Sequence, residues 1–227
     1  MVVDVGRLRR RYADRLLTLL AILLALNMFV FSPLIAAGYF VFHGFTVGAF
    51  LGIVAAMIVI SDNRAALAAM LLCAVANVAV LLLRLLHPAW PYNLYTLAAA
   101  WLVFAISLGT VVARAVFRPG RVTTHRIVGA VLLYLLIALA FATLFVFVGL
   151  SLPNSFIGMT FDDNLTVANS AIYFSFVTLT STGYGDIVPI HPIARSLCTA
   201  ESIVGMLYPA TLLVRLVTLE RNQHSTG

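Results

Sequence analysis

Apolar residues in this chain are grouped in long runs that short polar segments separate. A helix needs about 17–25 apolar residues to cross a bilayer. Six runs reach this length, so the pattern predicts six transmembrane helices. They lie at 15–32, 42–60, 65–86, 94–113, 127–150 and 193–219. Because proline removes a backbone donor and breaks helices, we expect the first helix to stop at Ser32–Pro33.

Residues 151–192 form a longer insert of mixed character between the fifth and sixth runs. The insert contains an apolar stretch at 168–179, which would make a helix of about 18 Å. That length is too short for a hydrocarbon core of about 30 Å. The stretch is followed by Thr-Ser-Thr-Gly-Tyr-Gly-Asp at 180–186. A half-length helix, a glycine-spaced strand and a return to the same side predict a re-entrant pore loop.

Composition excludes a water-soluble or disordered protein. Hydrophobic residues make up 63% of the 227 positions and charged residues only 10%, and the mean hydropathy is +1.06. A soluble domain is closer to half apolar and a quarter charged, and a disordered chain is polar. Lipid must therefore be the solvent for most of this chain, and we expect a multi-pass protein of the cell membrane.

Charge placement predicts the orientation in that membrane. The formal net charge is +6, and the basic residues cluster at the ends of the apolar runs. In a six-helix arrangement only Arg84 and Arg195 fall on the side opposite the termini. Cytoplasmic loops carry such an excess of arginine, so both termini are expected in the cytoplasm. The arginines form no continuous stripe, so we expect no nucleic-acid partner, and no loop is long enough for a soluble ligand-binding domain.

The glycine-spaced segment suits a path for cations. Gly183 and Gly185 permit backbone angles that other residues avoid, so consecutive carbonyl groups can face one axis. Rings of carbonyl oxygens can replace the hydration shell of a cation. The half-length helix ends just before this segment, and its negative end would favour a cation there.

Thr-Ser-Thr-Gly-Tyr-Gly-Asp resembles the selectivity filter of potassium channels. The resemblance extends from Ala171 to Leu213, and the chain also resembles the pore end of small bacterial channels with four helices before a two-helix pore. It implies an all-α membrane protein whose residues 1–126 form a four-helix region and 127–227 the pore domain. One filter strand per chain implies a homotetramer. It also implies K⁺ as the permeant ion, with no other cofactor, held by the carbonyls of Ser181, Thr182, Gly183 and Tyr184 in a filter that ends at Gly185.

The same resemblance implies supporting roles for residues around the filter. Gly205 matches the hinge glycine of the inner helix, and Pro209, about one turn later, adds a proline kink to the expected gating hinge. Filter support is expected from Tyr173, Thr178, Thr180, Asp186 and Glu201. Tyr173 stands where tryptophan is common in the family, and its hydroxyl could reach Asp186.

Glu201 is the only acidic residue in a predicted span, and a carboxylate at membrane depth is costly. Four copies could form an anionic ring in the cavity. Alternatively, Glu201 could accept hydrogen bonds from Thr178 or Thr180 and brace the pore helix. We favour bracing, because a buried carboxylate needs partners.

Three other functions are weighed against a potassium channel. Serine and threonine at 181 and 182, where threonine and valine or isoleucine are usual, are also compatible with a non-selective cation channel. A non-conducting regulatory subunit is a further alternative. An enzyme is not expected, because Ser175 and Ser181 lie in no Gly-x-Ser-x-Gly elbow. The fourth run, 94–113, contains no ionisable residue, so we expect no voltage sensor.

Overall fold

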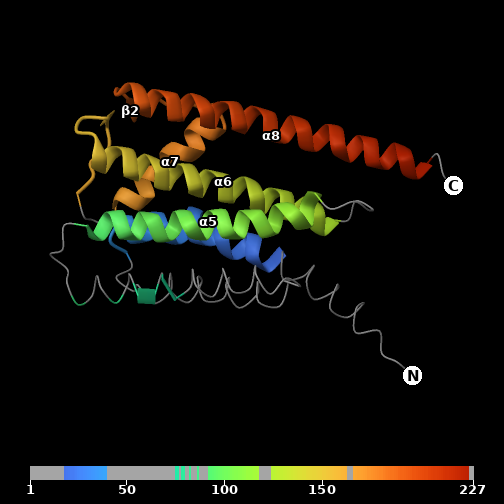
Figure 1. Cartoon of the computed structure of the whole chain (residues 1–227), viewed down its shortest axis with the longest axis horizontal. Helices are drawn as coiled ribbons and strands as arrows, with labels where there is room; N and C mark the ends of the chain where they lie inside the picture. Colours follow the sequence, from blue (N-terminus) through green and yellow to red (C-terminus); the bar gives the residue numbers. More distant parts are fainter. Residues whose placement is uncertain are drawn as a thin grey trace.

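A computed structural model describes residues 18–39, 92–117, 124–162 and 166–224, together with positions 75, 76, 78, 79, 82 and 86 (Figure 1). Four helices in these ranges are long and apolar enough to cross a membrane. They are Thr18–Ala36, Asn93–Arg114, Ile127–Ser151 and Pro192–Val214. The expected second span lies outside the described residues, as does the third apart from the six single positions.

The described elements are mostly helices, with one small two-stranded sheet. The first helix contains a π-helical segment, η1 (Asn27–Phe31), and then α2 (Ser32–Ala36). The other elements are α5 (Asn93–Phe117), α6 (Thr124–Ser151), β1 (Phe156–Ile157), α7 (Thr166–Leu179), β2 (Val188–Pro189) and α8 (Pro192–His224). The helix α6 begins three residues before the predicted fifth span, so the expected boundary after residue 126 falls within its first turn.

The first helix does not stop at Ser32–Pro33, so that prediction is wrong. It continues to Ala36, and the amide of Ser32 donates to the carbonyl of Asn27 in π-helical register. Proline lacks a donor and clashes with the preceding turn of a regular α-helix. The wider π turn comes directly before Pro33 and places it in the first turn of α2, where a missing amide is tolerated.

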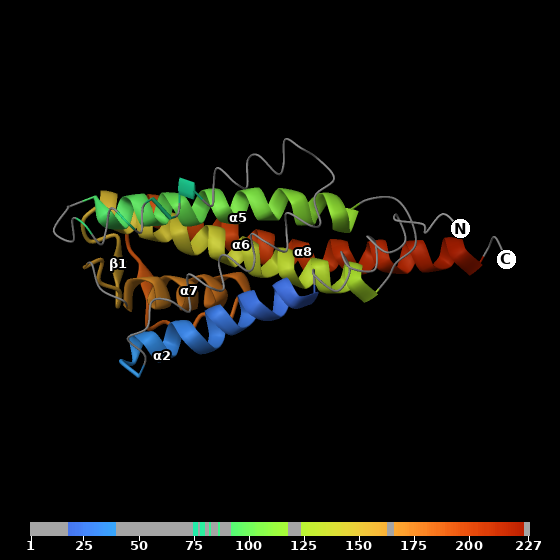
Figure 2. The ribbon, with the colours of Figure 1, turned by 90° about the horizontal axis from the view of Figure 1, so that it is seen from below.

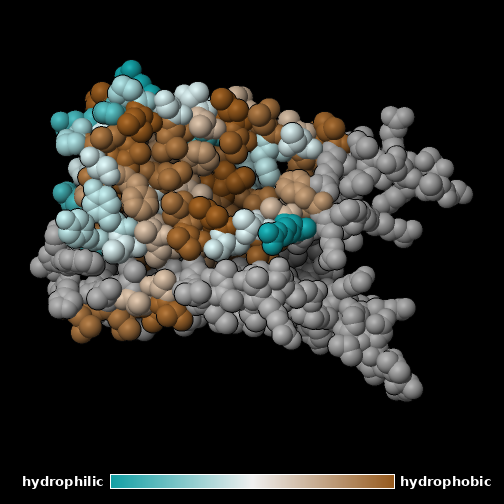
Figure 3. Space-filling view, in the orientation of Figure 1, coloured by the Kyte–Doolittle hydropathy of each residue, from teal (hydrophilic) through white to brown (hydrophobic). Residues whose placement is uncertain are grey.

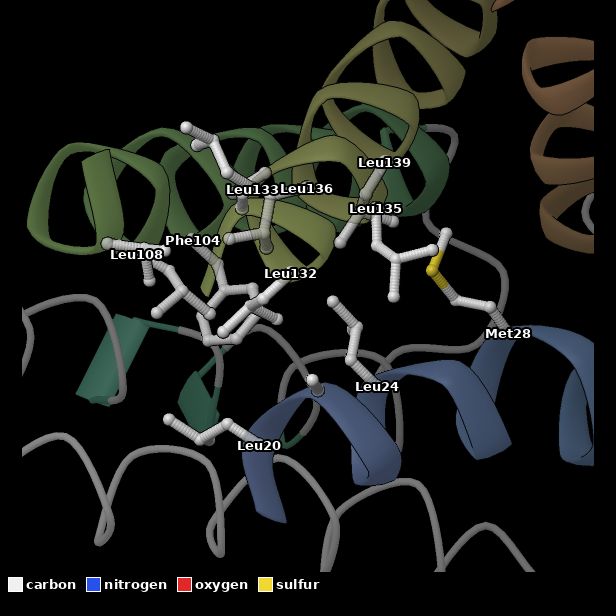
Figure 4. Close-up of a cluster of buried hydrophobic side chains, with 14 of the residues drawn as sticks. Leu20, Leu24, Met28, Phe104, Leu108, Leu132, Leu133, Leu135, Leu136 and Leu139 are labelled. Atoms are coloured by element: carbon white, nitrogen blue, oxygen red, sulfur yellow. The ribbon is translucent and has the colours of Figure 1, made fainter. Parts of the chain in front are cut away.

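Apolar side chains from three helices form the main core. Leu24 and Met28 of the first helix meet Leu108 of α5 and Leu132 and Leu136 of α6, all at most 2% exposed (Figure 4). The first helix also reaches the second half of the chain, because Phe29 packs on Phe176 of α7 with 4.9 Å between ring centroids. Figure 2 shows α2 beside α7.

The outer surface of the helices is apolar, as a lipid-facing surface must be. Figure 3 shows a hydrophobic band across the middle of the molecule, with more polar residues at the end that carries β2. Large exposed side chains include Val103, Ile106, Val131 and Ile203. Water-soluble proteins do not expose apolar surface on this scale. The chain is therefore a membrane protein.

The two short strands are an addition to the expected all-α architecture. β1 and β2 are antiparallel, with Phe156 opposite Pro189 and Ile157 opposite Val188. Each strand has two residues, which is too short to produce a detectable alternation of apolar and polar positions. The pairing connects the loop that follows α6 to the segment that follows α7.

Candidate functional site

The short helix α7 lies obliquely between α6 and α8 (Figure 1). It has 14 residues, or a length of about 21 Å, and it ends at Leu179 as predicted. Its buried Phe174 packs against Phe145 of α6, with ring centroids 4.9 Å apart, and against Phe156 of β1 at 5.6 Å. This cluster of rings holds α7 at a defined position relative to α6 and the sheet.

A Schellman motif ends α7. The amide of Ser181 donates to the carbonyl of Thr178 at 3.0 Å, and the amide of Thr182 donates to the carbonyl of Val177 at 2.9 Å. This motif needs a residue with positive φ one place after the C-cap, where glycine is usual. Ser181 occupies that place with φ of 56°. Ser181 therefore completes the cap of α7 and is also the first residue of the segment predicted to be the filter.

Backbone angles alternate in sign along the next residues. Ser181, Gly183 and Gly185 have φ of 56°, 58° and 82°, whereas Thr182 and Tyr184 between them do not have positive φ. In an ordinary strand successive peptide groups point to opposite sides. An alternation of right- and left-handed residues instead turns successive amides to one side. The carbonyl groups then lie together on the other side.

The hydrogen bonds of this segment give the same direction. Three consecutive amides, from Ser181, Thr182 and Gly183, donate back to the last turn of α7, and Thr182 and Gly183 share the carbonyl of Val177. The N–H and C=O of one trans peptide group point in opposite directions, so these three bonds direct the carbonyls of Thr180, Ser181 and Thr182 away from the last turn of α7. A Cβ added at Gly183 or Gly185 would meet nothing within 4 Å. Backbone conformation, and not space, is therefore what requires glycine at these positions.

Thr178 and Thr180, both predicted to support the filter, make hydrogen bonds near the start of the filter segment. The hydroxyl of Thr180 donates to the carbonyl of Phe176 at 2.7 Å and lies 2.8 Å from the hydroxyl of Thr182. Thr178 contributes its carbonyl, which accepts a hydrogen bond from Ser202 of α8 at 3.3 Å. The side chain of Thr182 is thus engaged beside α7, and its backbone carbonyl is left as the available ligand.

Tyr173 lies beside the other end of the segment. Its ring stacks on Tyr184, with an interplanar angle of 2° and 6.4 Å between centroids. Interaction with the side chain of Asp186 is the largest cause of a raised pKa for Tyr173. A hydrogen bond from the hydroxyl of Tyr173 to Asp186 stays a prediction.

The loop after α6 contacts the segment from outside, a feature that the sequence analysis did not identify. The carbonyl of Ser155 accepts hydrogen bonds from the amides of Ile190 at 2.8 Å and His191 at 3.3 Å. Gly158, with φ of 82°, lies so close to the carbonyl of Asp186 that a Cβ would overlap it. A lone glycine in a polar loop was the only signal in the sequence, and it does not reveal its neighbour.

Comparison with known families shows which class of protein this part of the chain resembles. Residues 131–221 match the profile of a family described as "Ion channel". The segment 131–221 belongs to an ion channel family. This channel segment includes most of α6, all of α7, residues 180–191 and most of α8. It therefore contains every residue of the site described above.

Two curated relatives match a stretch of 55 residues of the chain. "Protein LctB" from Bacillus caldotenax is 40% identical over 55 residues, and "Protein LctB" from Geobacillus stearothermophilus is 36% identical over 55 residues. The match covers 24% of this chain and 40% of each relative. The chain therefore spans two fifths of the length of these relatives. No solved structure is a significant match.

Glu201 of the channel segment faces α7, and its side chain is 0% exposed. The prediction that Glu201 accepts hydrogen bonds from Thr178 or Thr180 is wrong. The carboxyl group is hydrogen-bonded to the hydroxyl of Ser175, with 2.5 Å between Oε1 and Oγ. Ser175 lies about one helical turn before Thr178, so the same face of α7 meets Glu201 one turn further from the filter.

Gly205 and Pro209, predicted to form a hinge, lie in a helix that is continuous from Pro192 to His224. A Cβ at Gly205 would overlap the carbonyl of Leu179, the last residue of α7. The same carbonyl accepts a hydrogen bond of 3.4 Å from Tyr134 of α6. Gly205 is therefore a point of close backbone approach between α8 and α7, and its role as a hinge stays a prediction.

Proposed function

We propose that this protein is a subunit of a potassium-selective channel whose filter is the backbone of residues 181–185. The alternating φ angles at Ser181, Gly183 and Gly185 carry the proposal, because they turn successive carbonyls to one side. Carbonyl oxygens in this arrangement can take the place of water around a K⁺ ion. The carbonyls of Ser181, Thr182, Gly183 and Tyr184 would line the path, with the hydroxyl of Ser181 at its inner end.

The complete channel in this proposal is a homotetramer. One chain supplies one filter strand, and a closed ring of oxygens needs several strands around an axis. We place six helices in each subunit, with α7 and residues 180–191 as the re-entrant loop between the fifth and sixth. Residues 1–126 precede the pore and 127–227 form it. The arginine distribution favours the cell membrane with both termini in the cytoplasm.

A second candidate is a channel that passes Na⁺ as well as K⁺. Ser181 and Thr182 favour it, because their side chains differ from those usual in potassium channels. The contact between the hydroxyls of Thr180 and Thr182 favours strict selectivity, since it orders the strand beside α7. A non-conducting subunit of another channel is a third possibility.

Cation flux into liposomes that contain the purified protein separates these functions. Uptake of K⁺ with little Na⁺ is expected, and a reversal potential measured with K⁺ facing Na⁺ gives the ratio. Comparable uptake of both ions would support the mixed channel instead. No uptake by a correctly assembled protein would reject both channel proposals and favour the regulatory subunit.

Replacement of Gly183 by alanine tests the filter itself. The required positive φ disfavours any Cβ, so Gly183→Ala should abolish K⁺ flux while membrane insertion continues. Gly109→Ala in α5 is the matched control, because its Cβ would make an ordinary contact of 3.8 Å with Leu133. Wild-type flux in Gly183→Ala would reject the filter assignment.

A further inference from the structure

The hydroxyl of Ser175 makes two short contacts inside the membrane region, with groups from two other helices. Its oxygen lies 2.7 Å from the carbonyl oxygen of Ala138 in α6 and 2.5 Å from Oε1 of Glu201 in α8. Ser175 is 0% exposed, and so is Glu201. One serine side chain of α7 therefore links the outer helix α6 to the inner helix α8.

The number of protons in this cluster determines the state of Glu201. A serine hydroxyl carries one proton, and a backbone carbonyl can only accept. When Ser175 donates to Ala138, the hydrogen bond between Ser175 and Glu201 requires a proton that belongs to the carboxyl group. An ionised Glu201 would leave one of these two oxygen–oxygen contacts without a hydrogen.

The surroundings of Glu201 favour the neutral form for a second reason. Its Oε2 is buried and has no hydrogen-bond partner among the described residues. Isolated buried carboxylates are costly, and they become neutral instead of remaining charged. The guanidinium of Arg195, on the same helix, donates to the carbonyl of Pro189.

The other titratable groups near Glu201 are neutral. Tyr134 of α6 and Cys198 of α8 are within electrostatic range of its carboxyl. The helix α7 contributes Tyr173 as its only titratable residue, and Tyr173 stacks on Tyr184 of the filter segment and interacts with Asp186. None of these groups supplies a positive charge that would stabilise an ionised Glu201.

We infer that Glu201 is a neutral carboxylic acid that donates to Ser175, and that Ser175 in turn donates to Ala138. This chain of two hydrogen bonds ties α8, α7 and α6 together through a single removable proton. Loss of that proton at high pH puts a charge into an apolar site and breaks the link at Ser175, four residues before α7 ends at Leu179. Support of the filter by α7 is therefore sensitive to pH, a consequence that rests on the proposed channel function.

Infrared spectroscopy of the reconstituted wild-type protein tests the proton without any need for conduction. The carbonyl band of a protonated carboxylic acid is expected at neutral pH and should be lost in Glu201→Gln. Asp162→Asn is the control, because Asp162 is an exposed acid in the loop after β1 and its replacement should leave the band unchanged. A wild-type spectrum with no such band, or a band that persists in Glu201→Gln, would overturn the inference.

The pH dependence of tetramer stability and K⁺ flux tests the consequence. Both should fall in the wild type as pH rises through the titration of Glu201. Glutamine can donate to Ser175 and does not titrate, so Glu201→Gln should lose this dependence and keep wild-type stability at neutral pH. Ser175→Ala should lower stability even at neutral pH. If the infrared band is present but neither the wild type nor any variant conducts, the proposed channel function fails and the protonated state of Glu201 stands. Identical pH profiles for the wild type and Glu201→Gln would reject the role of the proton.

Discussion

Gly205 of α8 packs directly against the backbone carbonyl of Leu179, where α7 ends. A side chain at position 205 would overlap that oxygen. The same oxygen accepts a hydrogen bond from the hydroxyl of Tyr134. The rings of Tyr134 and Tyr208 lie 5.6 Å apart next to this contact. Three helices therefore meet at the end of α7, just before the proposed filter, and a change at Gly205 acts on the filter through backbone contact.

Gly205→Ala should consequently change ion selectivity and lower stability. The overlap must be relieved by movement of α7 or α8, and overpacking of this kind costs about 1–3 kcal/mol. The ratio of K⁺ to Na⁺ permeability, from reversal potentials, and thermal unfolding of the purified protein measure the two effects. Altered open probability with an unchanged ratio would favour the hinge over the packing role.

Ser181→Gly separates the backbone function of Ser181 from that of its hydroxyl. Glycine adopts positive φ without the cost of about 1–2 kcal/mol that a side chain incurs, so the Schellman cap should be kept and stability should not fall. The innermost cation site loses its hydroxyl, so block of K⁺ flux by Ba²⁺ should weaken. Unchanged block would mean that the hydroxyl contributes no ligand.

Tyr173→Phe removes the hydroxyl predicted to bond to Asp186 and keeps the ring that stacks on Tyr184. We expect faster loss of K⁺ current during sustained recording, because the outer end of the filter loses a support. The pKa of Tyr173 is raised from 10.0, so the wild-type bond is complete below that value and is lost as pH rises through the raised pKa. In a Glu201→Gln background, where residue 201 does not titrate, a comparison of current decay between neutral and strongly alkaline pH should show this loss with Tyr173 present and not with Tyr173→Phe.

Gly158→Ala tests the loop that contacts the filter from outside. Both the positive φ of 82° and the nearby carbonyl of Asp186 oppose a side chain at this position. K⁺ flux and tetramer stability should both fall, although residue 158 lies far from the filter in sequence. Gly109→Ala again serves as the control, and wild-type behaviour of Gly158→Ala would show that the loop does not support the filter.

The apolar runs and the glycine spacing determined much of this protein in advance. Runs long enough to cross a bilayer indicate a membrane helix wherever they occur, because the lipid core leaves the backbone few alternatives. The end of α7 at Leu179 and the need for glycine at 183 and 185 also follow from local sequence. These features depend on residues that are close together along the chain, and they can therefore be predicted from the sequence.

Only the tertiary structure decided which groups meet across the helices. Ser175 in place of Thr178 or Thr180 as the partner of Glu201 depends on how far α8 is shifted along α7, and the sequences of the two helices do not fix that shift. The same holds for Gly205 against Leu179 and for Gly158 against Asp186, where the partner is distant along the chain. Such contacts arise from the relative placement of packed elements, which no local pattern of residues encodes.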